Sequence, residues 1–413
     1  MKKVFCLVIS VTMMLAMLTG CGAKKDTVTL TIWGDADNQA ILEQAFTEIN
    51  EAFEKEHPDI KLDYQYSGTF DTINVAVQSD SLPDLFWVQG NKSTKMAELA
   101  RNGYILNLDS YDMDSTRYSQ AAIDYATVDG SVYCSYPAFL DYATIYYNKE
   151  IFDALQISKP SDFGELVAAV ETLAQNGYTP IALGGKGDFD RYWLIQVMAP
   201  ALCADTMEQI SGHGDVDFTS MEKMFDTYRE WAEKGYMGKD FTSIDAVGAQ
   251  LAFTNGEAGM IVDGTWNNQM YRELNFEVGS FAFPDENGTR YAQSGESNYT
   301  TYAVAAKTEH PEEAVEYLRF LNSQQAEQIM ENYVGSIPSV KDLNIRDDSV
   351  KEHSEFDVVG ANIYHVLSGV ADETGKPQDV FLGEVLPKLM MSEITGKEAV
   401  AMIEEEMNKS SVR

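Results

Sequence analysis

The chain is short of cysteine, histidine and positive charge. Its 413 residues include four cysteines and five histidines, and 30 lysines and arginines stand against 65 aspartates and glutamates. The formal net charge of −35 would repel nucleic acid and anionic membranes, which excludes both as electrostatic partners. So few cysteines and such scattered histidines also argue against a metal site. We therefore expect no nucleic-acid partner, no metal and no cofactor.

Long apolar runs and familiar catalytic motifs are also absent. The apolar run of residues 4–18 is shorter than the ~20 residues of a membrane-spanning helix, and no later stretch approaches that length. No strict GxGxxG, Walker loop, HExxH or GxSxG occurs, and the glycine-rich residues 184–187 match a phosphate-binding loop only weakly. These absences give no support to an enzyme. They predict a soluble body, which we expect to be a monomer.

The amino terminus has the pattern of an export signal. The basic leader Met1-Lys2-Lys3 precedes the apolar run, which ends in Leu18-Thr19-Gly20-Cys21. That tetrapeptide resembles the bacterial lipobox, whose cysteine becomes the lipid-modified first residue of the mature protein. We predict a lipoprotein signal peptide over residues 1–20, lipidation of Cys21, and a tether over residues 21–26 that anchors the body to the cell membrane. The alternative is a plain secretory signal with an incidental cysteine.

Removal of the signal peptide leaves a chain long enough for two domains. Subtracting residues 1–20 from 413 gives 393 residues, which is more than a single core usually supports. The net charge moves from −35 to −37, because Lys2 and Lys3 are lost. Of the cysteines, Cys134 and Cys203 then remain unmodified. They could form one disulfide in an oxidising compartment or be two small buried side chains.

Hydrophobic periodicity predicts a strand–helix–strand unit at the start of the body. Apolar residues alternate with polar ones over residues 28–32 and again over residues 60–66, which predicts two strands. Between them, residues 38–56 carry one apolar helical face that ends before His57-Pro58. Residues 83–88 predict the next short buried strand. Such a unit implies a parallel sheet.

The same pattern restarts after residue 140. Further strands are predicted over residues 180–183, 260–262, 276–283 and 302–306. Further helices are predicted to begin after Ser161, which we expect to be the cap, at Pro311, and at the capping-box sequence Thr395-Gly396-Lys397-Glu398. Because no long linker separates the two series, we expect two closely joined α/β lobes.

Several segments occur in an order that is hard to obtain by chance. They are PDLF at 83–86, YPAFLD at 136–141, YYNKEIF at 146–152, KPSDF at 159–163, FTNGEAGM at 253–260, GTW at 264–266, FAFP at 281–284 and GSIP at 335–338. In this order, and behind a lipobox, they resemble family 1 extracellular solute-binding proteins. This family includes the maltose-, maltodextrin- and oligosaccharide-binding proteins of ABC importers. The resemblance spans essentially the whole mature chain.

The resemblance implies an α/β, periplasmic-binding-protein-like fold. It would have two lobes, each a mostly parallel sheet flanked by helices, joined by a multi-strand hinge. The crossings are expected near residues 139–142, 295–300 and 335–338. Lobe 1 would comprise residues 27–139 with 300–337, and lobe 2 residues 140–295 with 338–413. A sugar would lie between the lobes, which would close around it by a hinge motion.

Candidate sugar-binding residues follow the predicted strands of the first lobe. A sugar needs flat aromatic rings for its C–H faces and hydrogen-bonding groups for its hydroxyls. Trp33, Asp35 and Asp37 follow the first strand, at the sheet edge where open parallel sheets bind ligands. Both carboxylates could accept hydroxyl hydrogens, or they could cap the following helix. Trp87 and Gln89 follow the second buried strand and are weaker candidates.

The resemblance adds candidates at the hinge and in the second lobe. Asp141 falls where the family carries an acidic ligand residue beside the hinge; the alternative is an internal salt bridge. The further candidates are Tyr192, Trp193, Asp263, Trp266, Ser297, Asn298 and Phe381. Trp193 and Trp266 would stack on the sugar and Phe381 would form a late aromatic wall, although large aromatics are mostly core.

The expected function is therefore that of an extracytoplasmic solute-binding protein, not an enzyme. It would capture a carbohydrate and dock on the ABC permease subunits in the membrane. The same fold could instead bind a polyamine, with Asp35, Asp37 and Asp141 as counter-charges. A lipid-anchored glycosidase is a less favoured alternative. It would need a pair of carboxylates, but with 65 acidic residues such pairs are expected by chance and are no evidence for an enzyme. An adhesion or scaffold lipoprotein would bind no small molecule.

Overall fold

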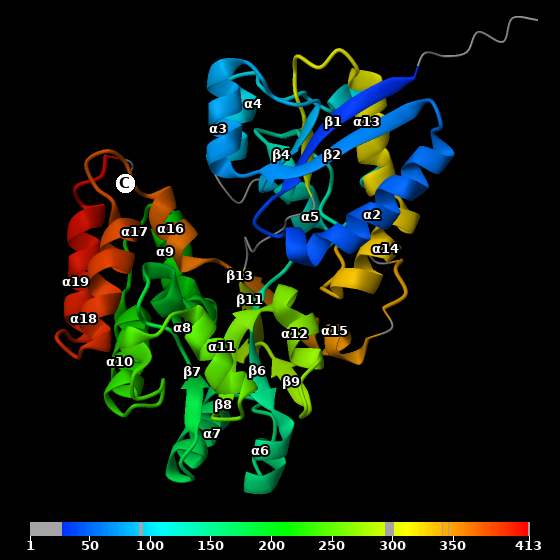
Figure 1. The fold of residues 1–413 in the computed structure, drawn as a ribbon. Coiled ribbons are helices and arrows are strands. Elements are labelled where there is room, and N and C mark those ends of the chain that lie inside the picture. The colour runs from blue at the N-terminus through cyan, green and yellow to red at the C-terminus, as the bar shows by residue number, and fades with distance from the viewer. Residues whose placement is uncertain (1–26, 91–93, 294–300, 341, 346, 412–413) are drawn as a thin grey trace, which may run out of the picture.

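The computed structural model has two α/β lobes, as Figure 1 shows. The structure describes residues 27–90, 94–293, 301–340, 342–345 and 347–411. The predicted signal peptide and tether, with Cys21, lie outside the described residues, as do Ser297 and Asn298. Within the part that is described, no helix has the length and apolar character needed to cross a membrane. The predicted two-lobe α/β architecture is confirmed.

The sheet of lobe 1 has the strand order β12-β3-β1-β2. Strand β1 (Val28–Asp35) pairs in parallel with both β2 (Ile60–Gly68) and β3 (Leu85–Trp87), as the sequence pattern predicts. Strand β12 (Tyr302–Val304) joins the β3 edge in the antiparallel sense. The helices of this lobe include α2 (Gln39–Glu56), α3 (Phe70–Ser79), α4 (Thr94–Arg101), α5 (Gln120–Tyr125), α13 (Pro311–Leu321) and α14 (Gln324–Val334).

The sheet of lobe 2 has the strand order β7-β8-β6-β9 and differs from the expected parallel arrangement. Strands β7 (Thr179–Ala182) and β8 (Ala258–Gly264) are parallel, but β6 (Ala143–Asn148) is antiparallel to β8 and to β9 (Val278–Phe281). The helices include α6 (Lys149–Leu155), α7 (Phe163–Gln175), α8 (Asp188–Leu202), α9 (Ala204–Ser211), α10 (Thr219–Glu233), α11 (Ala246–Thr254) and α12 (Asn268–Arg272). The tail adds α15 (Asp348–His353), α16 (Ile363–Gly369), α17 (Pro377–Val380), α18 (Leu386–Met390) and α19 (Gly396–Met407).

One strand in each sheet runs against the others, and it is the strand that follows a segment of the other lobe. β6 begins beside the end of β8, since Ala143 pairs with Gly264. β12 begins beside the end of β3, since Tyr302 pairs with Trp87. The other strands of each sheet run toward this edge, whereas an arriving strand starts there and runs away. The reversed strand is central in lobe 2, so two of the three pairings in that sheet are antiparallel, although its other three strands run in one direction.

Helix starts follow the predicted caps, with one shift. At α7 the cap is Asp162, whose Oδ1 accepts a hydrogen bond from the backbone N–H of Glu165 at 2.8 Å. The hydroxyl of Ser161 instead donates to Oε2 of Glu165 at 2.7 Å. At α19 the predicted capping box is present, because Thr395 and Glu398 each accept a hydrogen bond from the other's backbone N–H. Either residue before α7 can satisfy a helix-start donor, so the sequence alone did not separate them.

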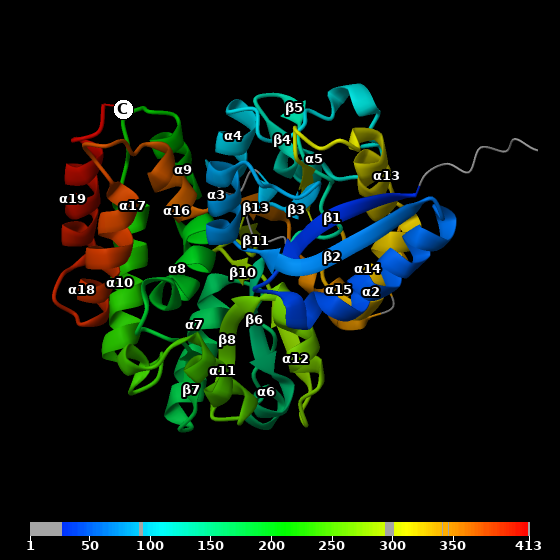
Figure 2. The same ribbon diagram turned by 45° about the horizontal axis from the view of Figure 1, so that its top comes forward.

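Two segments cross between the lobes side by side. Residues 138–140 run antiparallel to residues 337–339, and the N–H of Leu140 donates to the carbonyl of Ile337 at 3.1 Å. A small sheet of β10 (Phe283–Pro284), β11 (Arg290–Gln293) and β13 (Val358–Gly360) lies near this junction. The tail then returns to lobe 2, where Figure 2 shows α16 to α19 beside α9 and α10.

The described residues form one large cluster of buried apolar side chains in each lobe, and a smaller third cluster lies on the lobe 2 sheet around Tyr146, Phe253 and Tyr271. The cluster of lobe 1 draws on residues 30–142 and 292–340, and that of lobe 2 on residues 143–283 and 363–407. Cys134 lies in the first cluster and Cys203 in the second, and both are free thiols. A disulfide between them is therefore excluded in this fold. Burial raises the pKa of the Cys203 thiol to about 12, so this thiol stays protonated at neutral pH.

Candidate functional site

Four of the tryptophans lie near the carboxyl ends of the strands or in the segments that follow them. In lobe 1, Trp33 lies near the end of β1 and Trp87 ends β3. In lobe 2, Trp193 lies on α8, which follows β7, and Trp266 follows the end of β8. These strands run toward the edge at which β12 and β6 begin, so both sheet edges lie at the junction of the lobes. Ligands commonly bind at such edges.

Trp193 and Trp266 are in direct contact. Their ring centroids lie 5.8 Å apart and the ring planes are inclined by 52°. Both side chains are half-buried. Trp193 packs against the core of lobe 2, whereas Trp266, although carried by lobe 2, packs against the core of lobe 1. The inclined, partly exposed pair offers apolar ring faces beside the point where the lobes meet.

Gly264 makes room for the ring of Trp266. A Cβ atom at this position would lie 2.3 Å from Cε2 of Trp266, far inside van der Waals contact. Gly264 is the last residue of β8, and its carbonyl accepts a hydrogen bond from the hydroxyl of Tyr146 at 3.3 Å. The indole can therefore lie directly over the backbone only because this residue has no side chain.

Asp263 supports the loop that carries Trp266. Asp263 is buried, with 4 % of its surface exposed. Its carboxylate accepts hydrogen bonds from Nε2 of Gln250 at 2.8 Å, the N–H of Gly264 at 2.7 Å, Nδ2 of Asn267 at 3.0 Å and the hydroxyl of Tyr271 at 2.5 Å. Burial raises the pKa of Asp263, and these hydrogen bonds oppose that rise. The acceptor capacity of this carboxylate is thus used by the protein itself.

Asp35 accepts hydrogen bonds within the turn that precedes α2. It is fully buried. Its Oδ1 accepts from the N–H of Asp37 at 3.0 Å, and its Oδ2 accepts from Nδ2 of Asn38 at 2.7 Å. Burial is the main cause that raises the pKa of Asp35. These hydrogen bonds lie in the turn before α2, whose N-cap Asn38 has no side-chain capping hydrogen bond; Asp37, by contrast, is exposed.

Asp141 lies in the first crossing and has no exposed surface. Its Oδ1 accepts hydrogen bonds from Oγ1 of Thr265 at 2.7 Å and from Oγ of Ser336. The groups that contact this oxygen are therefore hydroxyls from lobe 2 and from the third crossing.

Trp87 presents a buried donor. The residue is 3 % exposed, and its Nε1 has no hydrogen-bond partner among the described residues. The ring of Phe70, at the start of α3, lies 5.4 Å from that of Trp87 and is 39 % exposed. A buried N–H without an acceptor is costly, which makes Trp87 a candidate donor to a ligand. Gln89, two residues further on, is half-buried.

Tyr192 and Phe381 lie inside lobe 2 rather than at its edge. Both are buried, and their rings meet edge to face with centroids 6.1 Å apart. The hydroxyl of Tyr192 donates to Oδ1 of Asn362 at 2.6 Å. Phe381 therefore occupies the core instead of the expected late aromatic wall, because its apolar neighbours bury that helical segment.

Besides Phe70 in lobe 1, sequence reasoning missed two aromatic side chains near the strand ends of lobe 2. Phe189 is 60 % exposed and lies four residues before Trp193 on α8, which places both on one helix face. The ring centroid of Phe189 lies 6.0 Å from that of Tyr364 on α16. The four-residue spacing could have identified Phe189. Tyr364 had no comparable signal, because only the returning tail brings it there.

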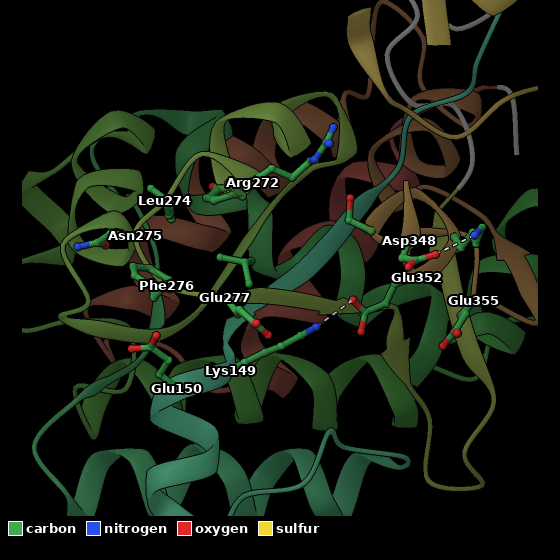
Figure 3. Close-up of a pocket in the computed structure, with 14 residues that line it drawn as sticks. Lys149, Glu150, Arg272, Leu274, Asn275, Phe276, Glu277, Asp348, Glu352 and Glu355 are labelled. Carbon is green, nitrogen blue, oxygen red and sulfur yellow. Dashed lines mark hydrogen bonds and ion pairs between the residues drawn. The ribbon is translucent and has the colours of Figure 1, made fainter. Parts of the chain in front are cut away.

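A cavity of about 810 Å³ lies at the free edge of β9, as Figure 3 shows. None of the tryptophans lines it. Its charged side chains approach one another: Nζ of Lys149 lies 4.0 Å from Glu352, and Nζ of Lys351 lies 2.7 Å from Asp348. Charges paired in this way favour no one class of ligand. Nor, among the residues that the structure describes, do any three metal-ligating side chains gather to hold an ion.

Comparisons with known proteins agree on one family. The sequence model of the family of bacterial extracellular solute-binding proteins matches residues 36–328 of this chain. The multiple sugar-binding protein of Streptococcus mutans is 25 % identical over 336 residues, covering 79 % of this chain and 78 % of that protein. A maltooligosaccharide ABC transporter solute-binding lipoprotein of Streptococcus pneumoniae is 22 % identical over 354 residues, covering 80 % and 79 %. The solved apo-form of RafE from Streptococcus pneumoniae has the same fold, with a TM-score of 0.75 at 18 % identity and coverage of 94 % and 99 %.

Proposed function

Because the chain belongs to the family of bacterial extracellular solute-binding proteins, we propose that it captures a sugar or oligosaccharide between its lobes and delivers it to the permease of an ABC importer. Two relatives are named for sugar binding or for maltooligosaccharide transport, and neither is named as an enzyme. The proposed activity is reversible binding, and it requires no covalent step and no cofactor.

The contact between Trp193 and Trp266 is the observation that carries this proposal. A pyranose ring has an apolar C–H face that packs on an indole, and two inclined indoles extend the apolar surface that it meets. Trp33 and the pair of Phe70 and Trp87 lie at the facing strand ends of lobe 1. A ligand held between the two edges would therefore meet aromatic groups from both lobes.

The polar groups at these edges favour a neutral ligand over a polyamine. Asp35 and Asp263 are buried and already accept hydrogen bonds from the protein, which leaves Asp37 as the exposed carboxylate among the candidates. A polyamine would need carboxylates that are open to its cations. The donor Nε1 of Trp87 instead suits the hydroxyl oxygen of a sugar.

We further propose that the lobes close by rotation about the paired crossing segments. Lobe 1 would comprise residues 27–139 with 300–337, and lobe 2 residues 140–295 with 338–413. The large core clusters support this division into two lobes, and the lobe 1 cluster extends a few residues past the boundaries, to residues 142, 292 and 340. The backbone pairing between residues 138–140 and 337–339 supports a hinge at that point.

The membrane attachment is proposed from the sequence pattern. Residues 1–20 would be removed and a lipid on Cys21 would hold the protein at the outer face of the cell membrane. The naming of the Streptococcus pneumoniae relative as a lipoprotein supports this. The protein would act as a monomer, with residues 21–26 as the tether.

Thermal unfolding in the presence of mono- and oligosaccharides, polyamines and amino acids tests the proposal. A ligand at a hundred times its dissociation constant stabilises the folded state by about 2.7 kcal/mol. We expect a selective shift with sugars that is lost in Trp266→Ala. It should be retained in Trp231→Phe, a matched control because Trp231 is buried in the core of lobe 2. A shift with a polyamine alone would contradict the substrate class, and no shift with any solute would contradict the function.

A further inference from the structure

Asp141 joins three segments of the chain at the hinge. Its Oδ1 accepts hydrogen bonds from Thr265, which directly follows β8, and from Ser336 in the third crossing. The neighbouring Tyr142 binds Thr265 twice: its carbonyl accepts from the N–H of Thr265 at 2.9 Å, and its N–H donates to Oγ1 of Thr265 at 3.2 Å. The first crossing, the third crossing and the loop that carries Trp266 thus meet at one carboxylate.

The direction of these hydrogen bonds is set by the groups present. Because Oγ1 of Thr265 accepts from the N–H of Tyr142, its own hydrogen is directed to Asp141. Asp141 and Thr265 are fully buried and Ser336 is 1 % exposed. Water therefore has no access to replace a lost hydrogen-bond partner. Removing one of these groups leaves another buried polar group without a hydrogen bond.

A second contact ties the same loop to the third crossing. Nδ2 of Asn268 donates to the carbonyl of Gly335 at 3.2 Å. Trp266 lies between Thr265 and Asn268, in a short 3-10 turn over residues 265–267. The hydrogen bonds of Thr265 and Asn268 therefore fix the backbone on both sides of Trp266, from which its ring packs against Trp193.

We infer that Asp141 is a positioning residue that, through Thr265, holds Trp266 against Trp193 and, through Ser336, couples this aromatic pair to the hinge. This deepens the proposed function and rests on it. The resemblance to the family had suggested a direct ligand contact for Asp141. A carboxylate without exposed surface acts instead by ordering the aromatic pair before the sugar arrives.

Thr265→Val tests the inference, because it removes the hydroxyl and nearly preserves the shape of the side chain. Thr206→Val is the matched control. Thr206 is also a buried threonine of lobe 2, and its hydroxyl donates to the carbonyl of Asp217 at 2.7 Å, away from the hinge. Asp141→Asn tests the carboxylate itself, and Thr265→Ser restores the hydroxyl.

Two readouts separate positioning from general destabilisation. The first is the circular dichroism of the ligand-free protein, in which two indoles in contact give an exciton couplet. We define the couplet of this pair as the part of the spectrum that Trp193→Phe abolishes. The second is the dissociation constant of the sugar. Thr265→Val and Asp141→Asn should reduce the couplet and weaken binding at least about tenfold, which corresponds to 1.4 kcal/mol. Thr265→Ser should recover most of both, whereas Thr206→Val should lower the melting temperature and leave both unchanged.

An unchanged couplet with unchanged affinity in Thr265→Val and Asp141→Asn overturns the inference. So does a loss of affinity in Asp141→Asn with an intact couplet, since that result makes Asp141 a direct ligand residue. If the wild-type protein binds no sugar, the proposed function fails, and the couplet of the ligand-free protein still decides the positioning role. Should Thr265→Val not fold, Ser336→Ala removes the other hydroxyl on the same oxygen and takes its place.

Discussion

Nε2 of His353 lies 2.8 Å from Oδ1 of Asn268, so helix α15 of the tail is hydrogen-bonded to helix α12 of lobe 2. Nδ1 of the same ring lies 2.8 Å from Oγ of Ser280 on β9. Asn268 in turn donates to the carbonyl of Gly335 at the third crossing. One buried imidazole therefore joins the tail, the sheet edge and the hinge of the molecule.

Acidification is predicted to weaken this junction. Burial lowers the pKa of His353 from 6.5 to about 4, against the opposing effect of the Asp347 charge. The unfolded chain therefore takes up this proton first, so the contribution of the neutral ring is complete above about pH 6.5 and is lost as the pH falls toward about 4. From about pH 7 to about pH 5 the loss amounts to ~2 kcal/mol in the free energy of unfolding.

Urea unfolding of the wild type and of His353→Gln at both pH values measures this loss. The wild type should lose more stability than the variant, by roughly the amount above. Glu327, whose pKa burial raises to about 7, contributes a pH dependence of opposite sign. It is present in both proteins and cancels in the comparison. Equal losses in the two proteins would show that the imidazole is not responsible.

Trp87→Phe should weaken sugar binding more than it affects folding. The substitution keeps an aromatic ring beside Phe70 and removes the N–H that has no acceptor among the described residues. The loss of one hydrogen bond to the ligand should cost about 0.5–1.5 kcal/mol of binding free energy. Titration calorimetry gives the affinity. Trp231→Phe is the control, because it makes the same reduction in ring size in the core of lobe 2. An affinity equal to that of the wild type would remove Trp87 from the site.

Gly264→Ala should displace the ring of Trp266. The new Cβ would lie 2.3 Å from the indole, so either the ring or the end of β8 must move. Overpacking of this kind costs about 1–3 kcal/mol of folding stability. Tryptophan fluorescence and sugar affinity should both change. Gly214→Ala is the control, because a Cβ there meets no atom within 4 Å and the backbone is not left-handed. Unaltered fluorescence in Gly264→Ala would contradict the assigned contact.

Cys21→Ser should release the protein from the membrane without changing sugar affinity. The predicted lipid attaches to the thiol of Cys21, and the proposed binding groups all lie in the body of the protein. Fractionation of cells into membrane and soluble parts measures the distribution, and titration of the released protein measures affinity. A variant that stays in the membrane fraction would contradict lipid anchoring.

The sequence by itself determined the elements and most of the architecture. Alternation and helical periodicity are local signals, and they predicted β1, α2, β2 and β3 near the observed bounds. The capping box at Thr395 and Glu398 likewise involves residues three positions apart, and it is present as predicted. The order of the family motifs then predicted two lobes, because each motif marks a known place in the chain.

Only the tertiary structure decided which of the candidate side chains meet. Trp193 and Trp266 come from different helical turns that follow different strands, and no local pattern reports their contact. Asp141 and Ser336 are 195 residues apart in sequence, so their hydrogen bond depends on the two crossings lying side by side. The reversal of β6 has the same origin, since it follows from the edge at which the chain arrives in lobe 2. Periodicity shows that a face is apolar, but packing between distant segments decides whether that face, as at Phe381, is core or binding surface.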